Sequence, residues 1–102
     1  MKMLGRGAIT TATVLYTVPA GFKTEVLSID LANTTAATVN CTIYLVPSGG
    51  SAGTTNMLVP NSPIGGYSMM QWTGDQVINA GDTIVGTGTG ITAHVTGEES
   101  RA

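Results

Sequence analysis

Charged side chains are scarce in this chain. Only 10% of its 102 residues are charged, and the long stretch from 7 to 97 holds five of them. They are Lys23, Glu25, Asp30, Asp75 and Asp82. Because surface charge keeps folded monomers apart, a domain so poor in charge is typical of proteins whose outer faces meet other protein. The composition therefore favours assembly over catalysis.

Basic residues are few and are never clustered. Lys23 is the single one between Arg6 and Arg101, and the net charge is -2, so the chain cannot neutralise a row of phosphates. We expect no nucleic-acid partner. No stretch approaches the roughly 18 apolar residues of a membrane span, so we expect no membrane partner either. The segment between Lys2 and Pro19 resembles a signal peptide only crudely, because it contains four threonines.

The chain has one cysteine and one histidine, which limits the chemistry that it can support. Cys41 excludes an internal disulfide, and a cysteine zinc site would need a second chain. Cys41 is predicted on the apolar face of its strand and His94 on the polar face of another, so they do not form a catalytic pair. Asp75 and Asp82 are predicted in turns, where Asp bonds its own backbone. We therefore expect no catalytic, cofactor-binding or metal-binding residue, and no enzyme.

Short segments of alternating polarity make up most of the sequence, and each is bounded by Gly, Pro, Asn or Asp. This pattern predicts an all-β fold. In one of the segments Leu27, Ile29 and Leu31 share a face and are predicted to point into the core. Residues 48–56 are small and polar, which predicts a surface loop. The predicted strands are residues 8–18, 23–33, 38–46, 57–59, 67–73, 83–86 and 91–96.

Seven or eight strands with frequent turn signals predict a single antiparallel β-sandwich that occupies residues 1–102 as one domain. We favour a jelly-roll-like topology. An immunoglobulin-like sandwich is the alternative, although the paired cysteines of that fold are missing. Residues 1–7 and 98–102 are predicted to be short tails outside the sandwich.

Tyr67, Met69, Met70 and Trp72 form the one cluster that could be an interaction surface. An alternating strand places Met70 and Trp72 on one face and Tyr67 and Met69 on the other. One of these faces is expected to be core. The other, if exposed, would suit a subunit contact or the stacking of a sugar ring.

The predicted tails carry half of the charged residues in the chain. Lys2 and Arg6 at one end, with Glu98, Glu99 and Arg101 at the other, could form salt-sensitive rim contacts between neighbouring copies. Solvated, disordered ends are the alternative.

Three stretches resemble small structural proteins of bacteriophage virions. They are YTVPAGFKTEVLSIDLANTT at 16–35, VNCTIYLVPSGGSAG at 39–53 and NAGDTI at 79–84, and in such proteins similar stretches recur in this order. The resemblance covers about half of the chain. It implies a β-sandwich that serves as a head decoration, tail-tip piece or fibre module and acts as a homo-oligomer, often a trimer, without a cofactor. It carries no functional residue over to this chain.

The expected function is therefore that of a non-enzymatic virion protein. A head decoration or cement protein, bound to the lattice of the major capsid protein, fits the short chain better than a fibre protein, which usually joins its tip to a longer shaft. The alternative is a tail or fibre module for host adhesion that binds carbohydrate, with Trp72 or Tyr67 as the stacking platform.

Overall fold

A computed structural model describes residues 2–10 and 12–101, and most of these residues lie in β-strands. One short 3-10 helix, η1 (Thr54–Asn56), interrupts them. Within the described residues no helix is long and apolar enough to cross a membrane. The eight strands are β1 (Lys2–Ile9), β2 (Thr13–Thr17), β3 (Phe22–Asn33), β4 (Val39–Val46), β5 (Met57–Ile64), β6 (Met69–Asn79), β7 (Thr83–Thr87) and β8 (Ile91–Arg101).

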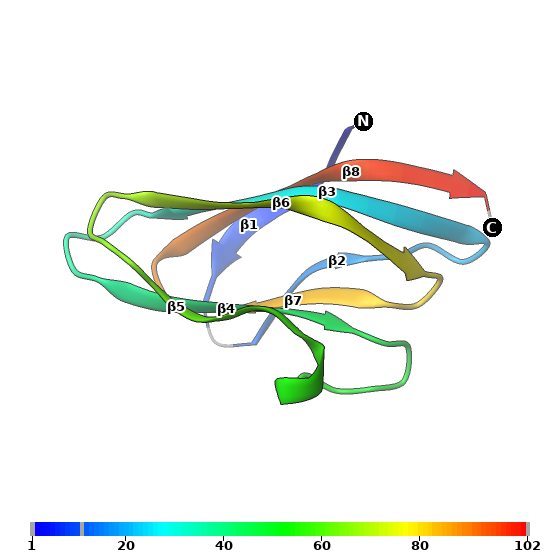
Figure 1. The fold of residues 1–102 in the computed structure, drawn as a ribbon, viewed down its shortest axis with the longest axis horizontal. Coiled ribbons are helices and arrows are strands. Elements are labelled where there is room, and N and C mark those ends of the chain that lie inside the picture. The colour runs from blue at the N-terminus through cyan, green and yellow to red at the C-terminus, as the bar shows by residue number, and fades with distance from the viewer. Residues whose placement is uncertain (1, 11, 102) are drawn as a thin grey trace.

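The strands form two four-stranded antiparallel sheets that pack face to face (Figure 1). Sheet A has the order β1-β8-β3-β6 and sheet B has the order β2-β7-β4-β5. The pairs β1/β8, β2/β7, β3/β6 and β4/β5 are those of one long folded ribbon that has been rolled into a sandwich. This is the strand order of a jelly roll, so the predicted all-β sandwich with jelly-roll topology is confirmed and the immunoglobulin-like alternative is wrong.

The core between the sheets is built from aliphatic side chains. The fully buried positions come from both layers, since alternate residues of each strand point inward. Trp72 and Met70 pack against this core from β6 and are only partly buried. The largest of the fully buried side chains are Ile9, Ile29, Leu31, Ile43, Ile84 and Ile91.

A β-bulge in β3 changes one of the predicted core positions. Ile29 and Leu31 are buried as predicted, but Leu27 is only half-buried. The register against both neighbouring strands shifts between Val26 and Ser28, so Val26 takes the inward position in place of Leu27. Alternation in the sequence does not reveal where such an extra residue is inserted.

The predicted tails are parts of the sheet. Residues 2–9 form β1, which pairs with β8, and β8 itself continues to Arg101. The prediction of tails at 1–7 and 98–102 is therefore wrong for residues 2–7 and 98–101, while Met1 and Ala102 lie outside the described residues. The sequence of β1 contains two glycines and little alternation, and its order comes from pairing with β8.

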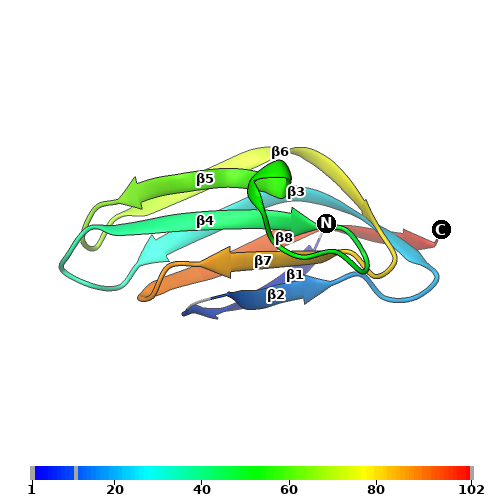
Figure 2. The same ribbon diagram turned by 90° about the horizontal axis from the view of Figure 1, so that it is seen from below.

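Other predicted boundaries also differ from the structure. The single strand expected at 8–18 is divided between β1 in sheet A and β2 in sheet B, because the chain crosses from one sheet to the other after Ile9. β5 continues through Pro60 and Pro63 to Ile64, which an edge strand of sheet B permits (Figure 2). The connection between β4 and β5 is exposed over 47–52, as predicted for a surface loop.

Candidate interaction surface

Four connections between strands gather at one end of the sandwich, where β1, β3, β5 and β7 end. These connections, which we call the loop end, lie toward the left of Figure 1. They comprise residues 10–12, of which 10 and 12 are described, together with 34–38, 65–68 and 88–90. All four contain only Thr, Ala, Gly, Ser and one Tyr, so the loop end carries no charged side chain.

Backbone hydrogen bonds join the four connections into one unit. Each bond links two connections that are far apart in the sequence, so the loops hold one another in place. The bonds run from Gly88 N to Thr10 O at 3.0 Å, from Thr34 N to Gly90 O at 3.0 Å and from Tyr67 N to Thr35 O at 2.9 Å.

Asn33, at the end of β3, connects the 34–38 and 65–68 loops through its side chain. The side chain is buried, and its Nδ2 donates to the carbonyl oxygens of Ala37 at 2.8 Å, Ile64 at 2.9 Å and Gly65 at 3.2 Å. Its Oδ1 accepts from the backbone N–H and the hydroxyl of Thr35, at 2.9 and 2.7 Å. The amide therefore hydrogen-bonds to backbone groups of both loops and to the end of β5. Sequence analysis missed this role, although an Asn followed by two Thr at a strand end is typical of a side chain that bonds its own turn.

Tyr67 is the most prominent side chain of the loop end, with 76% of its surface exposed. Its φ is +53°, in the left-handed region that non-glycine residues rarely adopt and that costs about 1 kcal/mol. The preceding residue must be glycine, because a Cβ on Gly66 would clash with the carbonyl oxygen of Ala36. The hydrogen bonds of the surrounding turn, including Ser68 N to Gly65 O at 3.0 Å, hold this conformation.

The predicted cluster is divided between the two sides of sheet A. Tyr67 lies in the turn before β6 rather than in a strand, and Met69, at the start of β6, is 62% exposed. Met70 and Trp72 lie opposite Leu31 and Ile29 in register and pack against the core. The structure thus leaves Tyr67 and Met69 exposed and places Trp72 where it contributes to packing.

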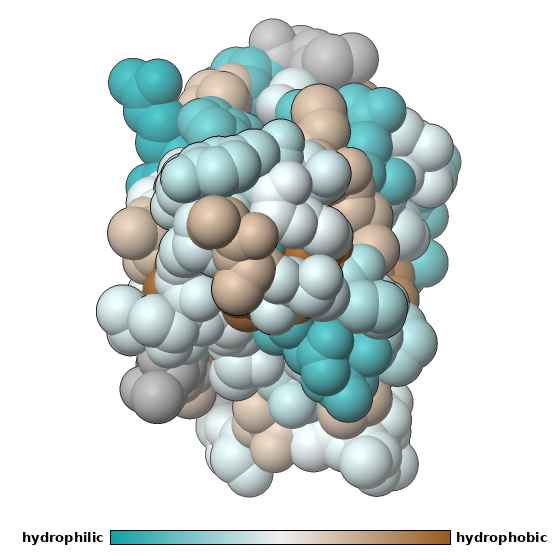
Figure 3. All heavy atoms as spheres, turned by 90° about the vertical axis from the view of Figure 1, so that its left-hand side faces the viewer, coloured by the Kyte–Doolittle hydropathy of each residue, from teal (hydrophilic) through white to brown (hydrophobic). Residues whose placement is uncertain are grey.

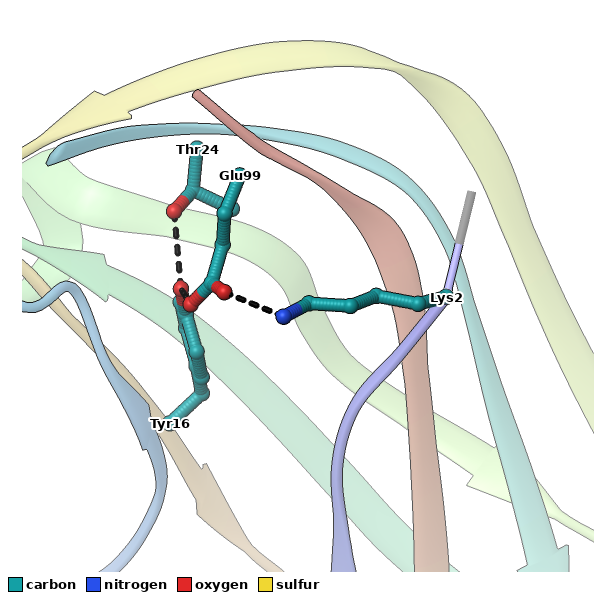
Figure 4. A network of polar contacts seen from close by, with 4 residues as sticks. All are labelled: Lys2, Tyr16, Thr24 and Glu99. Carbon is teal, nitrogen blue, oxygen red and sulfur yellow. Dashed lines mark hydrogen bonds and ion pairs between the residues drawn. The ribbon is translucent and has the colours of Figure 1, made fainter. Parts of the chain in front are cut away.

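Lys2 is engaged within the chain, in a network that also contains Glu99, Tyr16 and Thr24 (Figure 4). The Lys2 Nζ lies 2.5 Å from the Glu99 carboxylate, which also accepts a hydrogen bond from the Tyr16 hydroxyl. The contact with Lys2, and to a smaller extent the hydrogen bond from Tyr16, lower the pKa of Glu99. Burial and the bond to Glu99 raise the pKa of Tyr16 to about 12. The Tyr16 hydroxyl lies 2.8 Å from the Thr24 hydroxyl, so the network joins sheet B to sheet A.

Arg6 is exposed in the middle of β1, opposite His94 of β8. His94 in turn lies opposite Asp30 of β3, on the outer face of sheet A. Cys41 is fully buried in sheet B, and burial raises the pKa of its thiol to about 11. The prediction that Cys41 and His94 lie on an inner and an outer face is confirmed. In the part of the chain that the structure describes, no three His, Cys, Asp or Glu side chains are grouped so as to hold a metal ion.

Asp75 and Asp82 have different environments. Asp82 lies in the turn after β6 as predicted, and its carboxylate accepts from Ser48 N and Asn79 N, both at 2.8 Å. The prediction of a turn for Asp75 is wrong, because it lies within β6 where the register against β3 shifts. There its carboxyl group bonds that of Glu25, and this contact raises the pKa of Glu25.

Charge is segregated along the molecule. Arg6 and Asp30 lie in sheet A, each three residues before the loop-end terminus of its strand, and the other charged side chains lie in the half away from the loop end. Figure 3 looks onto the loop end, where pale and tan side chains of intermediate to apolar hydropathy lie in the middle and teal, hydrophilic groups lie beside them. The side chains of the charged half are Lys2, Lys23, Glu25, Asp75, Asp82, Glu98, Glu99 and Arg101.

The fold places this chain among the jelly-roll β-sandwiches, a class that includes viral capsid domains, lectins and cupins. The chain matches no model of a known protein family, no characterised protein sequence and no solved structure. Its function has to be inferred from its own surfaces, because a jelly roll supports many unrelated functions.

Proposed function

We propose that this protein is a non-enzymatic structural protein of a bacteriophage virion, and that it decorates the head by binding the lattice of the major capsid protein. The observation that carries the proposal is the segregation of charge. One end of the sandwich is uncharged and held by its own hydrogen bonds, and the opposite half carries most of the charge.

Such an arrangement suits a protein that sits on a larger assembly. An uncharged end loses little hydration energy when it is covered, whereas buried charges must be paired at a high cost. Loops that are already ordered also lose little conformational entropy on binding. The charged half would remain in water, where it keeps the decorated particles soluble.

The resemblance to phage virion proteins supports a place in the virion, but it does not identify a functional site on this chain. Its stretches form the end of β2, then β3 and β4 with their turns, and the corner before β7, all of which belong to the scaffold. Proteins of this kind commonly act as homo-oligomers, trimers among them. We therefore expect copies of this chain to contact one another on the lattice as well as the capsid protein beneath them.

The copy number of this chain in purified particles from the source culture tests the proposal directly. Quantitative mass spectrometry would compare it with the major capsid protein. A ratio comparable to the capsid protein is the expected result. A few copies per particle would place the chain in the tail or fibres, and its absence from particles would contradict any role in the virion.

Carbohydrate binding is the second candidate, and the exposed ring of Tyr67 is the observation that favours it. Trp72 is a weaker platform because it packs against the core. A glycan array tests this candidate. Binding that Tyr67→Gly abolishes and that unrelated surface substitutions leave intact would support host adhesion.

A further inference from the structure

We propose that the loop end is the docking surface of this protein, and that its partner is an uncharged protein surface that repeats in an array. This inference rests on the proposed function and names the contact surface and the chemistry of the partner. Tyr67 is the anchor of the contact, and the surrounding Thr, Ala and Gly residues form the flat area around it.

Two of the threonine hydroxyl groups in the 34–38 connection are turned toward the protein. Thr34 Oγ1 donates to Gly90 O at 2.8 Å, and Thr35 Oγ1 lies 2.7 Å from Asn33 Oδ1. These bonds engage the hydroxyl groups of both threonines within the protein, so fewer polar side-chain atoms are left for a partner beside the Tyr67 ring. A sugar is recognised by polar side chains that converge on its hydroxyl groups, so this surface favours protein over carbohydrate.

The absence of charge from residues 10–12, 34–38, 65–68 and 88–90 limits the kind of protein that fits. A charged partner surface would lose its hydration against the loop end without gaining an opposite charge. For the same reason, the charged half of a second copy is a poor partner, so head-to-tail stacking of this chain is disfavoured. A neutral partner surface avoids both costs.

Tyr67 has the properties of an interface anchor. Tyrosine is enriched at energetically dominant positions of interfaces because it offers a large, rigid contact area. Here the ring projects from a turn whose left-handed residue and hydrogen bonds are already in place before a partner arrives. Little ordering remains to be done on binding.

The size of the loop end favours an array over a single partner copy. The molecule measures 42 × 27 × 19 Å with the strands along the longest axis, so the end covers roughly 500 Å², below the ~800 Å² per partner of stable complexes. Two free copies joined end to end would therefore bind weakly. Many copies that also touch one another on a lattice gain affinity through multivalency.

Co-sedimentation with particles tests the inference, using virions of the source phage produced without this chain. Tyr67→Gly and Tyr67→Asn remove the ring while keeping residues that accept the left-handed backbone. Ala36→Glu and Ala36→Lys add a charge of either sign at an exposed position of the loop end. Val77→Glu and Val77→Lys are the matched controls, because Val77 is 58% exposed in the charged half.

We expect wild type to bind, the four loop-end variants to bind at least about tenfold more weakly, and the two controls to stay within about twofold of wild type. Binding should also be nearly independent of salt concentration. Circular dichroism and thermal unfolding of each variant would establish that its fold is intact.

The contrary results differ from one another. Wild type that does not bind overturns the proposed function and this inference with it. If wild type binds and the loop-end variants bind equally well, the proposed function stands and the docking surface is overturned. Tighter binding by one of the two Ala36 variants shows a charged partner surface, and glycan binding lost in Tyr67→Gly shows a carbohydrate partner. If wild type forms a stable dimer that Tyr67→Gly dissociates, the partner is a second copy of this chain. A charged partner, a carbohydrate partner and a second copy would each overturn the inference as stated.

Discussion

Asn33 is the residue on which the order of the loop end depends. It is a buried amide, and its polar atoms find partners in the 34–38 and 65–68 connections and at the end of β5. Its sequence, Asn-Thr-Thr, matches the pattern of a glycosylation acceptor. The buried amide nitrogen already donates to backbone carbonyls, so its function in the fold is structural.

Replacing Asn33 by Ala would remove the side-chain donor to the Ile64 carbonyl and the side-chain acceptor of the Thr35 N–H, whereas the Gly65 carbonyl would keep the N–H of Ser68. We expect Asn33→Ala to lower the free energy of unfolding by about 2–4 kcal/mol, because the hydrogen bonds of a buried amide to both loops are lost at once. Urea unfolding followed by circular dichroism measures this loss. Thr34→Ala is the control, since it removes one exposed hydrogen bond and should cost less than about 1 kcal/mol. Equal effects of the two substitutions would contradict the role assigned to Asn33.

Because of Tyr16, the folded protein is expected to lose stability at alkaline pH. Its pKa in the folded protein, about 12, is above the ordinary value of 10.0, so the folded state keeps a proton that the unfolded state loses. The resulting stabilisation is present below pH 10.0 and is lost as the pH rises through about 12. We expect a loss of up to about 2 kcal/mol in this range.

Tyr16→Phe should remove that part of the pH dependence. Urea unfolding of both proteins at a series of pH values measures it. The Cys41 thiol, whose pKa burial raises to about 11, contributes a loss of the same sign that remains in the variant. If Tyr16→Phe lost as much stability as wild type between neutral and alkaline pH, the hydrogen-bonded environment of Tyr16 would not be linked to folding.

Strand β5 shows how the sandwich limits unwanted contacts at an edge. Edge strands invite pairing with other chains, and proline blocks such pairing because it lacks an N–H group. Pro60 and Pro63 both lie in β5, at the edge of sheet B. The contact between copies is therefore not expected to extend sheet B at β5.

Replacing both prolines by threonine should open this edge. We expect Pro60→Thr combined with Pro63→Thr to associate several-fold more than wild type at equal concentration, as measured by light scattering. Asn61→Thr is the matched control, because it changes an exposed residue of the same strand and leaves the prolines in place. Unchanged scattering of the double variant would mean that the prolines do not protect the edge.

The whole molecule is held together by contacts between residues that are distant in sequence. β1 pairs with β8, so Lys2 lies opposite Gly97, and among the described strands only β4 and β5 are both paired and consecutive in sequence. Loop-closure entropy must be lost before such contacts can form, which slows folding.

We expect refolding from urea to take roughly milliseconds to seconds rather than microseconds. Trp72 is the single tryptophan and packs against the core, so its fluorescence reports the docking of β6 in a stopped-flow experiment. A far faster single phase would mean that local contacts dominate the transition state. The probe itself can be checked with Trp72→Phe, which should lose the signal and remain folded.

The amino-acid pattern was sufficient to predict the all-β class, the sandwich and most of its core. Alternation is a local property, and it placed Ile29, Leu31 and Cys41 inward and His94 outward in agreement with the structure. Turn chemistry correctly located Asp82. The scarcity of charged residues can be counted in the sequence, but their position in one half of the molecule cannot be predicted from it.

The remaining features depended on contacts between distant segments. The bulge that turns Leu27 away from the core, the strand at residues 2–9 and the pairing of Asp75 with Glu25 all arise where one strand meets another. The loop end exists because a jelly roll brings the ends of four strands to one side of the molecule. A local pattern does not specify which strands become neighbours, and the burial of Asn33 among those loops follows from that arrangement alone.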